Sequence, residues 1–121
     1  MSVNVVSLTE KIGKLTVQNE YRIIAQMNNY QFKIIRMDRE FIWHSHADTD
    51  ETFFVIDGEL EIALRDKVLK LKTNEMVVIP KGIEHKPKSN GECKIMLIEP
   101  GGTLNTGDAG GQLTDTREEW V

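Results

Sequence analysis

From Tyr21 to Glu99 the sequence repeats one pattern: short apolar or alternating runs of four to eight residues, each followed by turn-forming residues. Nine runs fit it: YRIIAQM, YQFKIIRM, FIWHSH, ETFFVI, ELEIAL, VLKL, MVVI, EHKPK and CKIMLIE. No segment between them is long enough for the helix of a β-α-β crossover, which argues against a parallel sheet. The pattern predicts an all-β fold, an antiparallel barrel or sandwich of short strands.

The segments on either side of these runs differ from them. Ser7 and Glu10 have the spacing of a capping box. Three apolar residues nearby fall on one helical face: Leu8, Ile12 and Leu15. A short N-terminal helix is therefore predicted. After Glu99 the chain reads PGGTLNTGDAGGQLTDTREEWV, whose five glycines predict an irregular tail with a turn of helix only at REEW. Trp120 is expected to pin this tail to an apolar surface.

Length and composition restrict the functions that this chain can have. A chain of 121 residues predicts one domain spanning 1–121, with a core barrel at about 21–100 and a tail at 101–121. The net charge of −4 disfavours nucleic acid as a partner. The N-terminus has no long apolar run, so neither a signal peptide nor a membrane span is predicted. The lone Cys93, in an apolar run, is interpreted as a core residue and fits a reducing, cytoplasmic location.

The three histidines suggest a metal site. On a strand, residues two apart point to the same side, so His44 and His46 would present two imidazoles together. Glu51 opens the next run after a four-residue loop, and a hairpin can place its carboxylate beside the two rings. His85 follows a turn at Pro80 and Gly82 that can lead the next strand into the same barrel. The alternative from spacing alone is that these are polar residues of a solvated hairpin.

The order of these residues resembles both signature motifs of the cupin superfamily over residues 38–89. The first motif is a glycine, five residues, H-x-H, three or four residues, E, six residues and G. Its matching residues are His44, His46, Glu51 and Gly58, with Asp38 in place of the opening glycine. The second motif is a glycine, five residues, P-x-G, two residues, H, three residues and N. Its matching residues are Pro80, Gly82 and His85, with Asn74 and Ser89 at the two ends. Asparagine shares the tolerance of glycine for left-handed backbone, so the departures affect turn geometry more than the histidines.

The resemblance implies a small single-domain bacterial-type cupin of an uncharacterised group, with a double-stranded β-helix or jelly-roll barrel. It implies one divalent transition metal, such as Fe, Mn, Ni, Zn or Cu, held by His44, His46, Glu51 and His85. It identifies no catalytic residue, because cupins include oxygenases, isomerases and non-catalytic proteins. Two functions therefore stay open: an oxygenase- or isomerase-like enzyme acting on a small molecule, and a binding or sensing module. A homodimer is also predicted, with the YRIIAQM strand as the suspected contact.

Alternation predicts which side chains surround the metal. Ile42, Phe53 and Val55 should share the face of the histidines and form an apolar cavity. The neighbouring run offers either Phe32, Ile34 and Arg36 or its opposite face. Arg36 would then clamp a carboxylate or, as strand-end arginines more often do, extend to solvent. A basic group of three lysines beside His85 either attracts an anion or is a solvated turn: Lys81, Lys86 and Lys88.

Overall fold

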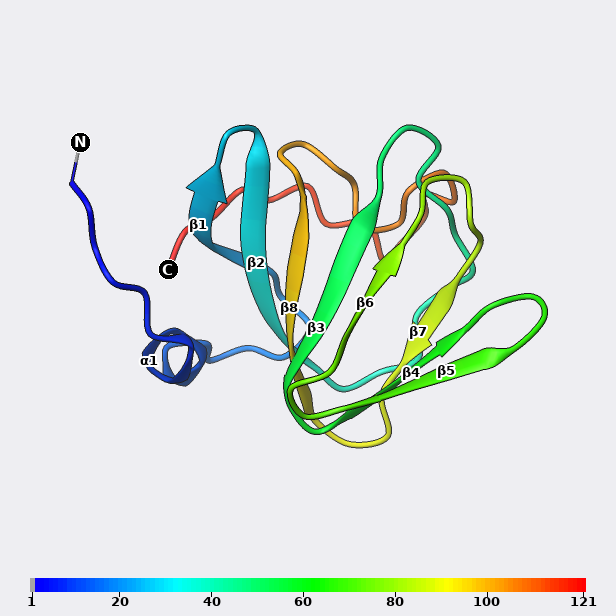
Figure 1. Cartoon of the computed structure of the whole chain (residues 1–121), viewed down its shortest axis with the longest axis horizontal. Helices are drawn as coiled ribbons and strands as arrows, with labels where there is room; N and C mark the ends of the chain where they lie inside the picture. Colours follow the sequence, from blue (N-terminus) through cyan, green and yellow to red (C-terminus); the bar gives the residue numbers. More distant parts are fainter. Residues whose placement is uncertain (1) are drawn as a thin grey trace.

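The computed structural model describes residues 2–121, which form one helix and eight strands (Figure 1). The elements are α1 (Leu8–Gly13), β1 (Arg22–Met27), β2 (Tyr30–Met37), β3 (Glu51–Asp57), β4 (Glu59–Ala63), β5 (Val68–Lys72), β6 (Met76–Ile79), β7 (Lys86–Lys88) and β8 (Cys93–Pro100). Eight of the nine predicted runs contain these strands. The capped N-terminal helix is confirmed, since the Glu10 amide donates to Ser7 Oγ at 3.2 Å.

The strands form two antiparallel sheets that together make a barrel. The larger sheet has the order β1-β2-β8-β3-β6, and the smaller has the order β5-β4-β7. Strands far apart in sequence are neighbours: β8 lies between β2 and β3, pairing with residues 30–37 on one side and 52–57 on the other. Figure 1 shows the larger sheet curving from β1 toward β6, with the β4–β5 hairpin extending to one side. The all-β prediction is confirmed.

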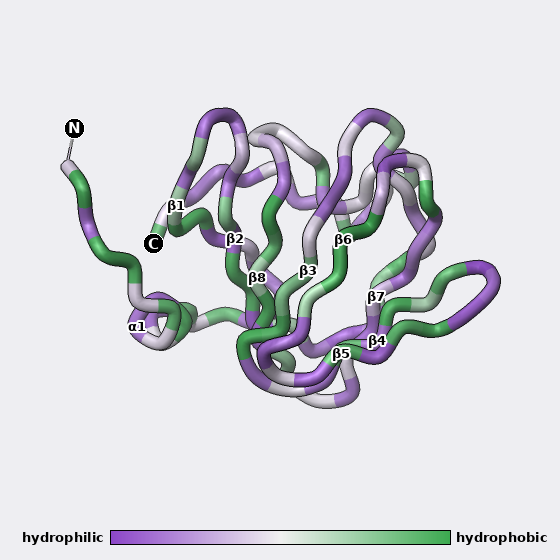
Figure 2. Tube along the Cα trace, viewed as in Figure 1, coloured by the Kyte–Doolittle hydropathy of each residue, from purple (hydrophilic) through white to green (hydrophobic). Residues whose placement is uncertain are grey.

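The barrel encloses an apolar core. Its central residues are less than about one-twentieth exposed and come from both sheets: Ile35, Val55, Leu60, Ile62, Cys93 and Ile95. Along β8 buried and half-buried residues alternate without a break, so one face of the strand lines the interior throughout its length. Figure 2 shows the same separation, with apolar stretches along the strands and polar stretches at the outer turns. Cys93 is a core residue, as predicted.

The helix changes which residues of β2 point inward. Ile12 and Leu15 of the N-terminal segment pack with Ile24 and Ile34 on the outer side of the large sheet. Both faces of β2 are therefore buried, and its interior face carries Gln31, Lys33, Ile35 and Met37. The interior side is thus the opposite face from Phe32, Ile34 and Arg36, the second of the two predicted possibilities.

Two local predictions were wrong. Residues 41–46 do not form a strand; they make a single isolated bridge, between His44 and His85. Ser45 is bonded instead to Asp108 of the tail through both of its backbone groups, so no continuous ladder can form. REEW does not form a helical turn, because the backbone there pairs in parallel with Ile23 at Trp120. Trp120 is 57% exposed, so its side chain contributes little to holding the tail.

The structure shows what the two residues that depart from the second motif do. Asn74 has φ of +69°, the left-handed conformation that a glycine would also adopt there. The Ser89 hydroxyl donates to the Met37 carbonyl at 3.1 Å and tethers the β7–β8 connection. In the part of the chain that the structure describes, no helix is long and apolar enough to cross a membrane.

Candidate metal centre

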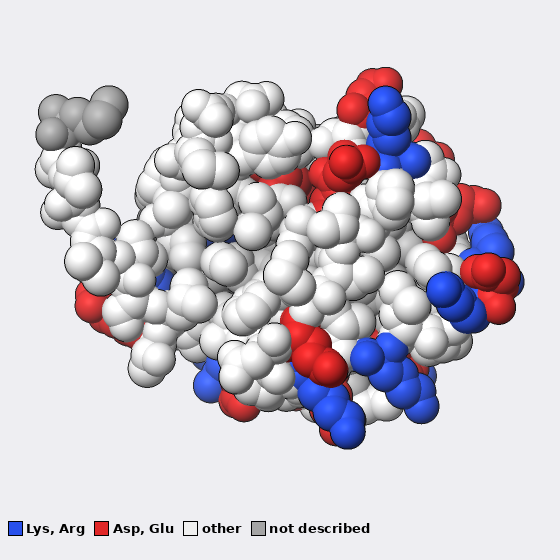
Figure 3. Space-filling model, in the orientation of Figure 1, with Lys and Arg blue, Asp and Glu red and all other residues white. Residues whose placement is uncertain are grey.

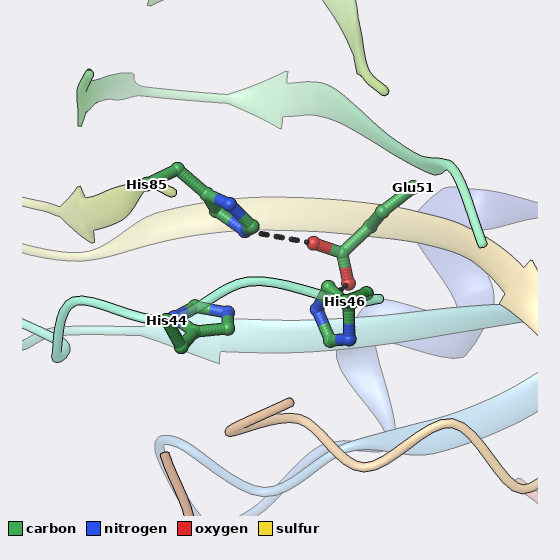
Figure 4. A group of neighbouring side chains, drawn as sticks. All are labelled: His44, His46, Glu51 and His85. Atoms are coloured by element: carbon green, nitrogen blue, oxygen red, sulfur yellow. Dashed lines mark hydrogen bonds and ion pairs between the residues drawn. The ribbon is translucent and has the colours of Figure 1, made fainter. Parts of the chain in front are cut away.

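Four buried side chains converge at one end of the barrel interior. His44, His46, Glu51 and His85 each offer a ligand atom, and these atoms all lie within 4.8 Å of one another. Each side chain is at most 6% exposed. Figure 4 shows the carboxylate of Glu51 between the rings of His46 and His85, with His44 facing the same space. The group that the sequence predicted is therefore brought together, although 41–46 is not a strand.

Backbone carbonyls orient two of the imidazoles. His44 Nδ1 lies 2.9 Å from the Ile42 carbonyl, and His85 Nδ1 lies 2.9 Å from the Ile83 carbonyl. A carbonyl only accepts, so each Nδ1 carries the proton and each Nε2 keeps a free lone pair. Burial, the main cause, lowers the pKa of His44 to about 4, which keeps this ring neutral at physiological pH. Neutral imidazole is the form that binds a metal.

The remaining donors fit a cation. Glu51 Oε1 lies 3.3 Å from His85 Nε2, and Glu51 Oε2 lies 3.5 Å from His46 Nε2. His46 Nε2 is nevertheless a buried nitrogen without a hydrogen-bond partner, because its contact with Glu51 lacks hydrogen-bond geometry. An orphaned imidazole nitrogen beside a carboxylate and two further imidazoles is costly unless something binds all of them. Three nitrogens and one oxygen suit a divalent transition metal.

A second carboxylate lies behind Glu51 and was not predicted. Glu99 on β8 is 2% exposed and receives a hydrogen bond from Lys33 Nζ at 3.1 Å. Burial and its hydrogen bond with Glu51 raise the pKa of Glu99 well above its usual range. Burial also acts to raise the pKa of Glu51, but the adjacent Glu99 carboxyl and the neighbouring imidazoles lower it overall. Glu51 is therefore the ionised member of the pair.

The glycine-rich tail supports the histidines from outside. The Asp108 amide donates to the Ser45 carbonyl at 3.0 Å, and the Ser45 amide donates to Asp108 Oδ1 at 2.8 Å. Gly107, with φ of +53°, packs so closely that a Cβ would lie 2.1 Å from the Ser45 carbonyl oxygen. This contact lies next to His46 in the chain. Residues 107–108 thus help to fix the position of the H-x-H segment.

An interior cavity of about 20 Å³ adjoins the four donors and is mostly apolar. His44 and Glu51 line it together with apolar side chains such as Phe41, Phe53 and Leu97. Its polar lining comes from Tyr21, Arg39, Glu99 and Asn105. The apolar character was predicted, whereas Tyr21 and Arg39 were missed. Tyr21 lies just before β1 and Arg39 just after β2, and nothing in the local pattern directs them inward.

The other basic candidates lie outside the cavity. Arg36 forms an ion pair with Glu92 and donates to the Leu15 carbonyl at 2.8 Å, so it faces away from the interior. Lys86 and Lys88 extend toward Glu40, at 3.7 and 3.9 Å. Both belong to the solvated surface, the second of the two interpretations of the lysine group.

Comparison with known proteins agrees with this geometry. A family model described as a cupin domain matches residues 34–99. The uncharacterized protein YdbB of Bacillus subtilis is 39% identical over 67 residues, which are 54% of this chain and 59% of that protein. An uncharacterized protein of Aquifex aeolicus is 37% identical over 54 residues, 45% of each chain. The chain therefore spans about half the length of these curated relatives.

A solved structure covers more of the chain. The crystal structure of a cupin-2 domain containing protein from Shewanella frigidimarina is 51% identical, covers 79% of this chain and 94% of that chain, and superposes with a TM-score of 0.77. The family match covers more than half of the sequence, and the barrel and the positions of both motifs agree with it. The chain belongs to the cupin family.

Proposed function

We propose that this cupin holds one divalent transition metal on His44, His46, Glu51 and His85 and uses it to bind and transform a small organic molecule. The observation that carries the proposal is the convergence of four buried donor atoms from three separate segments within 4.8 Å. The orphaned His46 Nε2 and the backbone-oriented rings of His44 and His85 support it.

The coordination count supports a role beyond structure. Three imidazoles and one monodentate carboxylate fill four of the six positions of an octahedral ion, so two are left for exogenous ligands. When bound, such an ion supplies Lewis acidity or redox chemistry, as in oxygenase- or isomerase-like reactions. The chain provides the surroundings: Phe41, Phe53 and Leu97 exclude water, and the Glu99 carboxyl lies beside Glu51.

Metal analysis tests the site. Protein is purified without added metal and then titrated with Mn²⁺, Ni²⁺ or Zn²⁺. Its metal content, measured by elemental mass spectrometry, should be one ion per chain. The double variant H44A/H46A and the single variant E51Q should lose most of it, because each removes donors from the shared group. Glu59→Gln, at an exposed carboxylate that begins β4, is the control. Full occupancy in H44A/H46A would refute the site.

A ligand panel tests the chemistry. Metal-loaded protein is incubated with small hydroxy-ketones, keto acids and sugar fragments, with and without oxygen, and products are sought by mass spectrometry. Turnover that H44A/H46A abolishes supports the enzyme. Ligands that bind and remain unchanged across the panel support the alternative, a binding or sensing module, which needs the metal and the cavity but no reacting group.

A homodimer and a cytoplasmic location complete the proposal. β1 and β6 are the edges of the large sheet, and Met27, Met76 and Val78 are about half exposed on or near them. Figure 3 shows few charges over β1 and β2. The tail already occupies the outer edge of β1 at Ile23, which limits the YRIIAQM contact to the rest of that strand. A monomeric mass by light scattering at micromolar concentration would contradict the dimer. The cytoplasmic location rests on the single cysteine, Cys93.

A further inference from the structure

Arg39 is a partly buried cation whose charge is not neutralised. It follows β2 and is only half-buried, yet its Nε atom is inaccessible to solvent and has no hydrogen-bond partner. Its guanidinium lies 4.8 Å from the centre of the Phe41 ring and lines the same cavity as the Tyr21 phenol. Among residues 2–121 it forms no ion pair with any carboxylate. A guanidinium placed in this way keeps hydrogen-bonding capacity for a ligand.

Nearby arginines and lysines are already engaged. Arg117, at the same outer surface, pairs with Asp115 and Glu20, each at 2.9 Å. Lys33 inside the barrel pairs with Glu99. Arg39 is therefore the cation near the candidate metal centre that is available to an incoming anion.

Arg39 also lies at the boundary between two spaces. It lines the interior cavity that His44 and Glu51 line, and it lines an outer hollow of about 400 Å³ under tail residues 112–117. No other residue lines both. The inner cavity, at about 20 Å³, has room for little more than a water, whereas the outer hollow has the size of a small-molecule site. A ligand in the hollow would meet Arg39 before it met the metal ligands.

The interior charges favour an anion. Even if both carboxylates are ionised, the two negative charges of Glu51 and Glu99 only cancel the two positive charges of Lys33 and Arg39. A divalent ion on the four donors then leaves two positive charges uncompensated in an apolar surrounding. Such an imbalance is costly unless an anionic ligand neutralises it.

We propose that Arg39, with Tyr21 beside it, is the recognition site for a carboxylate on the small molecule that this cupin binds, so that the substrate or ligand is a small organic acid. This inference rests on the proposed function, because the other end of the acid is directed toward the metal. The guanidinium forms a two-pronged contact with the carboxylate, a geometry that ammonium groups cannot reproduce. The neutral Tyr21 phenol contributes a further polar contact at the same place.

The test uses a matched pair of probes on the full chain loaded with Ni²⁺. Pyruvate and pyruvamide have nearly the same shape and the same keto oxygen for a metal, but only pyruvate carries a charge. Calorimetric titration should show tighter binding of pyruvate. Arg39→Met, which keeps most of the side-chain length, should weaken pyruvate binding about 10- to 100-fold and leave pyruvamide unchanged. Arg39→Lys should bind pyruvate with an affinity between those of the wild type and Arg39→Met, because it keeps the charge and loses the planar fork.

The controls separate this inference from the proposed function. Arg65→Met removes an arginine that stacks on Trp43 at 3.8 Å, outside the cavity, and should not change pyruvate binding. Metal content and melting temperature of the Arg39 variants should equal those of the wild type. A wild type that holds metal and binds both probes equally, or an Arg39→Met variant that keeps wild-type affinity for pyruvate, would overturn the Arg39 site alone. A wild type that holds no metal would overturn the proposed function and, with it, this inference.

Discussion

At the scale of single residues, the candidate centre depends on a glycine that bears no functional group. Gly107 lies far along the chain from His46, but the tail brings it against the backbone of Ser45. Its positive φ is one reason for glycine, and the lack of space for a Cβ is the second. Gly110, with φ of +62°, has only the first reason, since a Cβ there would meet open space. A comparison of the two positions therefore separates the effect of backbone strain from the effect of a direct steric contact.

We therefore expect Gly107→Ala to be more harmful than Gly110→Ala. Gly110→Ala should cost about 1 kcal/mol of unfolding free energy, from strain alone. Gly107→Ala should cost about 2–4 kcal/mol and weaken metal binding about 10-fold or more, because Ser45 and His46 must shift. Denaturant unfolding and metal titration of both variants measure this. Equal effects of the two substitutions would show that the steric contact is unimportant.

At the scale of elements, the tail is fastened to β1 by a small set of polar contacts. The Ile23 amide donates to the Glu119 carbonyl at 2.8 Å, and the Val121 amide donates to the Ile23 carbonyl at 3.1 Å. Arg117 bridges Asp115 of the tail to Glu20 just before β1. Hydrogen bonds from Arg117, the main cause, lower the pKa of both carboxyl groups. The side-chain contacts of Arg117 that help to hold the tail therefore depend on two ionised acids, Glu20 and Asp115.

Acid should release the tail before it unfolds the barrel. A carboxyl whose pKa is lowered by folding stabilises the folded form above its ordinary pKa, and this contribution is lost as the pH falls through the lowered value. Between about pH 5 and pH 2.5 the hydrogen-exchange protection of the Val121 amide should thus fall more than that of Ile95 in the core. Asp115→Asn should lower the protection of Val121 already at pH 5 and make it less sensitive to acid. A parallel fall for Val121 and Ile95 in the wild type would contradict this.

At the scale of the whole molecule, the proposed ligands come from segments that only the closed barrel brings together. The H-x-H segment, the start of β3 and the residue before β7 meet because β8 joins β2 to β3 and the small sheet folds over them. An unfolded chain has no such group, so we expect the proposed metal to bind the folded state in preference. Folding and metal binding should therefore be coupled.

Removing the metal should lower stability by a calculable amount. With free metal at 100 times the dissociation constant, binding adds about 2.7 kcal/mol to the free energy of unfolding. For a domain of this size that corresponds to a melting temperature about 10 °C higher than with a chelator present. Scanning calorimetry with Ni²⁺ and with EDTA measures the difference, and H44A/H46A should show none. A wild-type melting temperature that is independent of metal would argue against binding to the folded state.

The sequence by itself determined the strand rhythm, the capped helix and the four residues of the candidate centre. Periodicity and turn residues are local signals. They identify the eight strands without information on which strands pair with each other. The match to two spaced motifs directed attention to His44, His46, Glu51 and His85, although the strand assumed for the first two was wrong. The spacing nevertheless identified residues that come together, because contacts with the tail and with His85 position this segment where a strand ladder was expected to do so.

Only the tertiary structure decided what surrounds those four residues. Alternation along β2 separates its two faces, but each face mixes apolar and polar residues. Only the packing of Ile12 and Leu15 on the outside settles that Lys33 and Ile35 point inward. Arg39, Tyr21 and Gly107 lie in irregular segments, where backbone direction has no period to follow. Their positions depend on contacts between residues distant in sequence, which exist only after the barrel has closed and the tail has packed against it.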